Sequence, residues 1–236
     1  MISLDFSVFK NRLFLISKLK NIKAIFWDLD GTLWQEQAVA EHIYSLYVSH
    51  FSKITKKSFE ESRELLLEFE KKGFDWAETI SYFSQIPRLN ILVELDKKIK
   101  RGKFINSDNS IEDLLGKVRQ KGIRNFVASN MTSKNGILGL QKLGIKKPQE
   151  TFDDLFFLDT IFLAKPDRLF FSKIIEKTHS NPNEALFVGD SYANDIFPAK
   201  SIGFNTCLIR NKRGSADLKY SQVKDLLDNV LLHLDR

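Results

Sequence analysis

The chain has 236 residues, of which 43% are hydrophobic and 28% charged, proportions that are ordinary for a globular protein. Its formal net charge of +6 is modest for this length, and its lysines and arginines form no long block, so we expect no nucleic-acid partner. The single cysteine, Cys207, excludes an internal disulfide and fits a reducing compartment, and no apolar stretch approaches the length of a membrane span, so we expect a cytoplasmic protein.

The N-terminal 20 residues are rich in apolar side chains but are interrupted by Asp5, Lys10 and Arg12. No small-residue cleavage site follows them, which makes them a poor signal peptide. Their spacing favours an amphipathic helix. We expect this helix to dock on the rest of the chain, and docking on a partner or on a membrane surface stays an alternative.

Residues 23–30 predict a buried strand, because the segment is short, apolar, β-branched and aromatic and then meets a glycine. The next segment, residues 35–104, has a different character. Helical spacing is present at Phe59–Lys71 and at 75–85, with Gly73 and Pro87 between and after these runs, and we find no convincing strand. This segment predicts a helical insertion.

From residue 106 onward, strand-like and helical segments alternate. We predict strands at 123–129, 155–158, 185–188 and Asn205–Ile209. We predict helices at 111–121 with Ser110 as the N-cap, at 134–143 ending at Gly144, at Arg168–Thr178, at 192–202 with Pro198 as a kink or first turn, and at Val223–Leu234. Such alternation predicts an α/β fold, in which a mostly parallel sheet is covered by helices on both faces.

Polar side chains follow each of the first four predicted strands. They are Asp28 and Asp30, then Ser129 and Asn130, then Lys165, and finally Asp190 with Asp195. Parallel strands deliver the residues at their carboxyl ends to one edge of the sheet. Carboxylates that converge there repel each other unless a cation binds, and oxygen donors without a His or Cys cluster favour Mg²⁺. With a hydroxyl and a lysine, such a site suits a phosphoryl group.

The sequence Asp28-Leu29-Asp30-Gly31-Thr32-Leu33 resembles the first motif of the haloacid dehalogenase-like superfamily. Ser129, Lys165 with Pro166, and Gly189-Asp190-Ser191 with Asp195 resemble its second, third and fourth motifs, in the right order. Singly, each motif is also typical of a turn, a helix cap or an exposed loop. The resemblance covers residues 23–210. It implies a Rossmann-like three-layer core over residues 1–34 and 105–236, and a helical cap domain over residues 35–104.

The resemblance also implies a phosphatase-type hydrolase and assigns its chemistry. Asp28 would be the nucleophile and would form an aspartyl-phosphate, while Asp30 would protonate the leaving group and then activate water. Side chains two residues apart in a strand share a face, which fits this division of work. Ser129, Asn130 and Lys165 would bind the phosphoryl group.

The same resemblance implies the metal site. Mg²⁺ would be held by the Asp28 carboxylate, the Asp30 backbone carbonyl and Asp190. Asp195 would support the metal or pair with Lys165. The substrate class is a small phosphorylated metabolite, such as a sugar phosphate, phosphoglycolate or a nucleotide, and the motifs do not choose among these.

Other members of the superfamily offer alternatives. A dehalogenase lacks the second aspartate of the first motif, so Asp30 argues against it. A phosphonate hydrolase needs a cap lysine, and Lys53, Lys56 and Lys57 are candidates that nothing singles out. A phosphosugar mutase carries a histidine near position 40, where this chain has Ala40 and, two residues on, His42. A non-catalytic protein that binds phosphorylated ligands is a further alternative. In the cap, a mixed apolar and cationic pocket is expected from Trp34, Phe69, Phe74, Trp76, Tyr82, Phe83 and Arg88.

Overall fold

The computed structural model describes residues 19–210 and 213–234. Most of the predicted N-terminal amphipathic helix lies outside these residues. Within them, Leu19 and Ile22 are buried in the core next to the first strand. No helix in the described ranges is both long and apolar enough to cross a bilayer.

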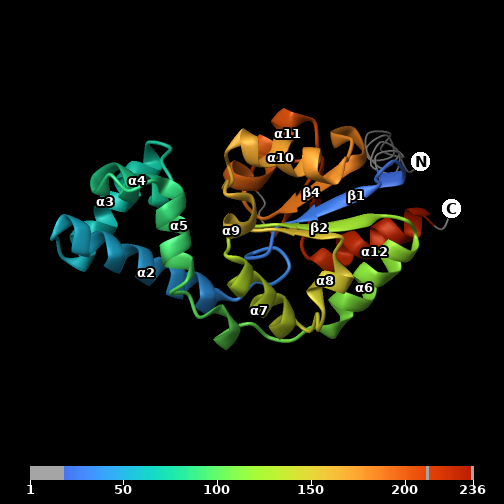
Figure 1. The fold of residues 1–236 in the computed structure, drawn as a ribbon, viewed down its shortest axis with the longest axis horizontal. Coiled ribbons are helices and arrows are strands. Elements are labelled where there is room, and N and C mark those ends of the chain that lie inside the picture. The colour runs from blue at the N-terminus through green and yellow to red at the C-terminus, as the bar shows by residue number, and fades with distance from the viewer. Residues whose placement is uncertain (1–18, 211–212, 235–236) are drawn as a thin grey trace, which may run out of the picture.

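The described residues form one sheet of six parallel strands, with the order β3-β2-β1-β4-β5-β6. Its central strand, β1, pairs with β2 on one side and with β4 on the other (Figure 1). The strand bounds are β1 Ala24–Trp27, β2 Arg124–Ala128, β3 Asp154–Phe156, β4 Ala185–Gly189, β5 Asn205–Ile209 and β6 Leu218–Tyr220. The predicted α/β fold is therefore confirmed, and β6 is a strand that the sequence did not predict.

The strand β1 is buried on both faces, and its side chains alternate between two apolar clusters. Ile25 and Trp27 belong to one cluster, and Ala24 and Phe26 belong to the other. The ring of Phe26 stacks on that of Phe126 in β2, with centroids 4.8 Å apart. A strand with no solvent-facing side needs a continuous apolar run, which is the pattern that predicted it.

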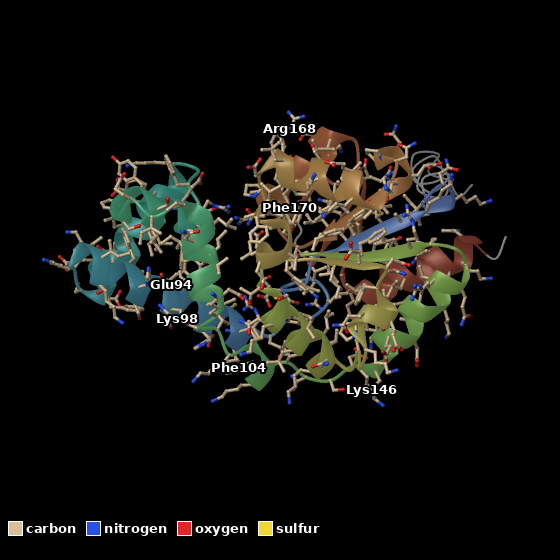
Figure 2. The ribbon with its side chains drawn as sticks, viewed as in Figure 1. Glu94, Lys98, Phe104, Lys146, Arg168 and Phe170 are labelled. Atoms are coloured by element: carbon tan, nitrogen blue, oxygen red, sulfur yellow. The ribbon has the colours of Figure 1, made fainter. Side chains whose placement is uncertain are left out.

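Helices cover both faces of the sheet, which gives three layers. One face carries α10 (Arg168–Thr178) and α11 (Phe197–Ile202), and the other carries α6 (Asn109–Gln120), α7 (Ser133–Leu143) and α12 (Val223–Leu234) (Figure 1). On α10, Phe170 points inward and is fully buried, whereas Arg168 lies at the outer surface (Figure 2). Shorter elements complete this part: α8 (Pro148–Thr151), α9 (Leu158–Ile161) and the 3₁₀ turns Arg101–Lys103 and Pro182–Glu184.

Four helices between β1 and β2 form a separate body, here called the helical body: α2 (Gln37–Thr55), α3 (Phe59–Lys71), α4 (Trp76–Ser84) and α5 (Arg88–Asp96) (Figure 1). Capping boxes at Ser58 and Asp75 begin α3 and α4. The helical body has its own apolar core, built around Phe51, Leu66 and Ile80 and continued by Leu158 of α9. The described residues 37–96 contain no strand. The predicted domain boundaries at 34/35 and 104/105 stay predictions.

Two predicted helices differ from the structure in detail. The helix predicted at 111–121 begins at Asn109, because the Asp108 carboxylate accepts a hydrogen bond from the Ser110 N–H and so acts as the N-cap in place of Ser110. The helix predicted at 192–202 is divided into a π-helical turn, Tyr192–Ile196, and α11. Pro198 lies in the first turn of α11, where its missing N–H leaves no hydrogen bond unmade.

Candidate active site

The three central strands carry the candidate residues to one edge of the sheet. Asp28 follows β1 directly, and its N–H still donates to the Val188 carbonyl of β4 over 2.9 Å. Asp190 follows β4 in the same way. Ser129 follows β2, with its N–H held by the Phe156 carbonyl at 3.0 Å. Because main-chain pairing continues to Asp28 and Ser129, these two side chains begin from fixed backbone positions.

Gly31 makes the close approach of two of these strand ends geometrically feasible. Its φ of +78° lies in the left-handed region, and a Cβ placed there would collide with the carboxylate of Asp190. Beyond it the chain turns, with the N–H groups of Thr32 and Leu33 each donating to the Leu29 carbonyl over 3.0 Å. The Asp-Gly sequence is therefore required both by the turn and by the neighbouring carboxylate.

Lys165 is buried between two carboxylates. Its Nζ donates to Asp28 Oδ1 over 2.7 Å and to Asp195 Oδ1 over 2.6 Å, and its side chain is 3% exposed. Asn130 fixes the loop from which it comes: the Lys165 N–H donates to Asn130 Oδ1, and Asn130 Nδ2 donates to the Lys165 carbonyl, both over 2.8 Å. The side-chain amide of Asn130 therefore positions the lysine, and the binding of the phosphoryl group by Asn130 stays a prediction.

At this edge the carboxylates of Asp28, Asp190 and Asp195 outnumber the one ammonium group of Lys165 and repel one another. Burial acts to lower the pKa of Lys165, but Asp195 and Asp28 outweigh burial, so the pKa is raised and the amine is a cation at neutral pH. Burial raises the pKa of Asp195 to about 6, although Lys165 opposes the rise. Burial, followed by the charges of Asp28 and Asp195, raises the pKa of Asp190 to about 8. An additional cation would relieve this repulsion.

The donor set fits a hard divalent cation. Asp28, Asp190 and Asp195 each offer a carboxylate oxygen, and these oxygens lie within 4.8 Å of one another. Carboxylate oxygens are the ligands that Mg²⁺ prefers, and it commonly uses few of them. The side chain of Asp30 is not part of this group among the described residues, and the metal ligands Asp28, the Asp30 backbone carbonyl and Asp190 stay a prediction.

The Asp30 carboxylate has two donors of its own. Arg101 Nε donates to Oδ2 over 2.7 Å, and Trp34 Nε1 donates to Oδ1 over 2.7 Å. Burial raises the pKa of Asp30, while Arg101 and Trp34 act to lower it and Asp28 adds a smaller increase. Arg101 also forms an ion pair with Asp96.

The sequence did not identify Arg101 and Asp96, because these residues lie more than 60 positions beyond the first motif and carry no motif of their own. Trp34 was predicted to shape the pocket or to pack. The signal that points to its hydrogen bond is its spacing, four residues after Asp30.

Two cavities meet at these residues. The smaller has a volume of about 170 Å³ and is lined by Asp28, Asp30, Ser129, Asn130, Lys165 and Asp190, together with neighbouring residues. The larger, of about 620 Å³, shares Asp30 and Asp190 and extends along Trp34, Glu36 and Ile43 toward the helical body. The predicted cap aromatics Phe69, Phe74, Tyr82 and Phe83 line neither cavity and pack against one another instead.

The sequence was compared with known families. The profile of the family described as Haloacid dehalogenase-like hydrolase matches residues 25–209, a range that contains every predicted site residue. The chain belongs to the haloacid dehalogenase-like hydrolase family. The superfamily that the four motifs predict is thereby confirmed.

Two curated relatives are named as phosphatases. The glyceraldehyde 3-phosphate phosphatase of Pyrococcus furiosus is 25% identical over 229 residues, which cover 92% of each chain. That of Methanothermobacter thermautotrophicus is 23% identical, over 83% of this chain and 89% of its own length. The crystal structure of a HAD phosphatase from Thermococcus onnurineus superposes with a TM-score of 0.61 and 23% identity, covering 89% of this chain and 98% of that one. The last comparison shows that this haloacid dehalogenase-like hydrolase shares the fold.

Proposed function

We propose that this chain is a Mg²⁺-dependent phosphatase that hydrolyses a small phosphomonoester through an aspartyl-phosphate on Asp28. The observation that carries the proposal is the buried ion pair of Lys165 with Asp28 and Asp195, set beside Asp190 at the carboxyl edge of the sheet. Family membership and the phosphatase relatives support the same reaction class.

The proposed nucleophile, Asp28, is held in place by its neighbours. Lys165 Nζ donates to Asp28 Oδ1 over 2.7 Å, which fixes the orientation of the carboxylate. Asp28 Oδ2, with a long contact of 3.4 Å from the Thr32 hydroxyl, is the oxygen to which we assign the attack on phosphorus. Lys165 then stabilises negative charge on the phosphoryl oxygens, and the Ser129 hydroxyl, in the same cavity, donates to them.

Asp30 moves the proton in both steps. In the first step, the bond between phosphorus and the leaving oxygen breaks as Asp28 attacks, and the Asp30 carboxylic acid gives its proton to that oxygen. In the second step, the Asp30 carboxylate accepts a proton from the water that attacks the aspartyl-phosphate. Inorganic phosphate leaves, and Asp28 is regenerated as a carboxylate.

The metal would be held by the carboxylates of Asp28 and Asp190 and by the backbone carbonyl of Asp30. When bound, Mg²⁺ supplies charge neutralisation for the phosphoryl group. Asp195 contributes through Lys165, since it holds the ammonium group at 2.6 Å and so fixes where that charge lies.

The substrate is a small phosphomonoester whose leaving group occupies the larger cavity beside Asp30. The names of the curated relatives make glyceraldehyde 3-phosphate the first substrate to try. We also propose that the helical body is the cap, which closes over this cavity and excludes water during transfer. A mutase is less well supported, because the ring of the nearby His42 packs on Phe104, with centroids 5.6 Å apart.

The test is phosphate release from a panel of phosphomonoesters, glyceraldehyde 3-phosphate among them, with Mg²⁺ or with EDTA. Asp28→Asn is expected to lower kcat by at least about 10³-fold without unfolding the protein, while Asp113→Asn, on the exposed face of α6, serves as the control. Substantial turnover by Asp28→Asn would overturn the nucleophile assignment. A folded wild-type protein that binds but cleaves no panel member would favour a phospho-ligand-binding protein instead.

A further inference from the structure

We propose that Arg101 is a positioning residue for Asp30, and that it sets the orientation of this carboxylate from the segment that returns from the helical body to the core. The inference rests on the proposed function and deepens it. It concerns how the proposed acid and base is held, and it assigns a task to a buried arginine that the motifs leave unexplained.

The side chain of Arg101 is itself held rigidly. It is 6% exposed and lies between the carboxylates of Asp30 and Asp96. Its Nε donates to Asp30 Oδ2 over 2.7 Å, and its Nη1 donates to Asp96 Oδ1. Burial acts to lower the pKa of Arg101, but the two carboxylates outweigh burial and raise it. A planar guanidinium that is fixed at two edges defines where Asp30 Oδ2 must lie.

The second oxygen of Asp30 is fixed by a different element. Trp34 Nε1 donates to Oδ1 over 2.7 Å, and the Trp34 side chain is buried. The indole packs so closely on α7 that a Cβ at Gly139 would lie 2.8 Å from it. With one donor on each oxygen, the carboxylate of Asp30 has little freedom to rotate about its terminal bond.

Asp96, the last residue of α5, connects this pair to the loop after β2. Its Oδ2 accepts from the N–H of Thr132 over 2.8 Å and from the Thr132 hydroxyl over 2.6 Å. The Asn135 amide adds a contact of 3.1 Å to the same oxygen. The loop after β1, which carries Asp30, is therefore joined through Arg101 and Asp96 to the loop after β2, which carries Ser129. These contacts hold the two loops in a fixed position relative to each other.

This arrangement has a kinetic signature, because Asp30 donates a proton only where the leaving oxygen needs one. An alkoxide leaving group, such as that of glycerol 3-phosphate, depends strongly on the acid, whereas p-nitrophenolate leaves with little help. The water attack on the aspartyl-phosphate is common to both esters, so the selective effect is expected in kcat/KM, which reports the first step: a variant that misplaces Asp30 loses kcat/KM on the alkyl ester selectively. A variant that merely loosens the fold loses rate on both esters.

The experiment compares the full-length wild type with Arg101→Gln, Arg101→Lys and the control Lys103→Gln, which changes an exposed residue in the same 3₁₀ turn. With Mg²⁺ present, Arg101→Gln is expected to lower kcat/KM for glycerol 3-phosphate at least about tenfold more than kcat/KM for p-nitrophenyl phosphate. Arg101→Lys retains one donor and is expected to recover part of this loss. In an Asp30→Asn background, Arg101→Gln is expected to add little, because the two residues act as a unit. Mg²⁺ affinity, measured by calorimetry, is expected to match that of wild type.

Equal losses on the two esters, or a full further loss in the Asp30→Asn background, would overturn the positioning role. If Arg101→Gln does not fold, Trp34→Phe serves in its place, because it removes only the donor to the other oxygen of Asp30. Trp34→Phe is expected to give the same ester selectivity, and equal losses on the two esters in this variant would count against the inference. A wild type that cleaves neither ester with Mg²⁺ would overturn the proposed function, and the inference with it. If the wild type cleaves both esters and Arg101→Gln cleaves them at the wild-type rates, the inference is overturned and the proposed function stands.

Discussion

Removing the charge of Lys165 is expected to lower the unfolding free energy of the protein. Its ammonium group contacts both Asp28 and Asp195 in a buried setting, and breaking a buried pair leaves a charge without compensation. In Lys165→Met the two carboxylates face each other without this cation. We expect the metal-free variant to lose about 3 kcal/mol of unfolding free energy, measured by urea denaturation at pH 7 in EDTA.

The matched control for this variant is Lys173→Met, which removes an exposed ion pair with Glu176 on α10 and is expected to cost well under about 1 kcal/mol. Equal unfolding free energies for the two variants would show that the buried pair contributes nothing to stability. Phosphatase activity of Lys165→Met is expected to fall by at least about 10²-fold.

Substitution of Gly31 by alanine tests whether this glycine gives the Asp190 carboxylate its space, and Gly73 serves as the control for backbone strain. Gly31→Ala introduces a side chain at φ +78° and against the Asp190 carboxylate, whereas Gly73→Ala introduces one at φ +95° into open space. Both are expected to lose about 1–2 kcal/mol of stability from the left-handed backbone. Only Gly31→Ala is expected to weaken Mg²⁺ binding, measured by calorimetry, and unchanged affinity would show that Asp190 is not displaced.

The residues of the candidate site divide into those that a sequence can indicate and those that it cannot. Asp28, Ser129 and Asp190 follow strands directly, and topology brings the ends of neighbouring parallel strands together. Arg101 and Asp96 reach the site from the end of the helical insertion, and their contact with Asp30 depends on how that insertion returns to the core. Local spacing holds no information about such a return.

Among the elements, α5 makes the contact between the helical body and the core that is easiest to test. Its first residue, Arg88, donates through Nη2 to the Lys165 carbonyl over 2.9 Å and through Nε to Asp75 Oδ2 over 2.8 Å. Asp75 is the N-cap of α4, so Arg88 joins two helices of the body to the lysine loop. In Arg88→Met this connection is lost.

We expect Arg88→Met to let the helical body separate from the core more often. Amide hydrogen exchange in residues 97–106, the segment that returns to the core, is expected to become faster by several-fold. The control is Arg63→Met, which removes an exposed contact with Glu60 inside α3. Identical exchange in the two variants would show that Arg88 does not hold the body in place.

Elements differ in how far their sequences predict them. The helix Arg168–Thr178 and the strand Asn205–Ile209 match their predictions because each combines clear periodicity with a clear end. The strand β6, Leu218–Tyr220, has three residues, lies at the sheet edge and contains an exposed lysine, so it has no apolar run to detect. The π-helical turn at Tyr192–Ile196 lies between the Ser191 N–H, which donates to the Asp195 carboxylate, and the first turn of α11, which contains Pro198.

At the scale of the whole molecule, stability, pH and metal are linked through Asp190. Its pKa is about 8 in the folded chain against 3.8 for the ordinary group, so the stability it contributes without metal is present below pH 3.8 and is lost as the pH rises through about 8. The proposed Mg²⁺ would bind the ionised form of Asp190 and displace its proton. We therefore expect Mg²⁺ affinity to rise about tenfold per pH unit between pH 6 and 7.

Thermal unfolding with and without excess Mg²⁺ measures this linkage. The rise in Tm on adding Mg²⁺ is expected to be larger at pH 8 than at pH 6, because ligand stabilisation grows with affinity. In Asp190→Asn both the rise and its pH dependence are expected to disappear. A rise in Tm that is independent of pH would contradict a protonated Asp190 in the metal-free protein.

The place of the helical body between two adjacent strands has a consequence for evolution. β1 and β2 pair in register, from Ala24 with Arg124 to Trp27 with Val127, so the sheet closes regardless of what lies between them in sequence. Gene segments of different length could be exchanged there without disturbing the nucleophile. The contact of Arg101 with Asp30 limits that freedom, because a replacement segment must also supply a cation to Asp30 where it rejoins the core. The proposed cap could therefore vary in length and in its side chains as long as this one cation is kept.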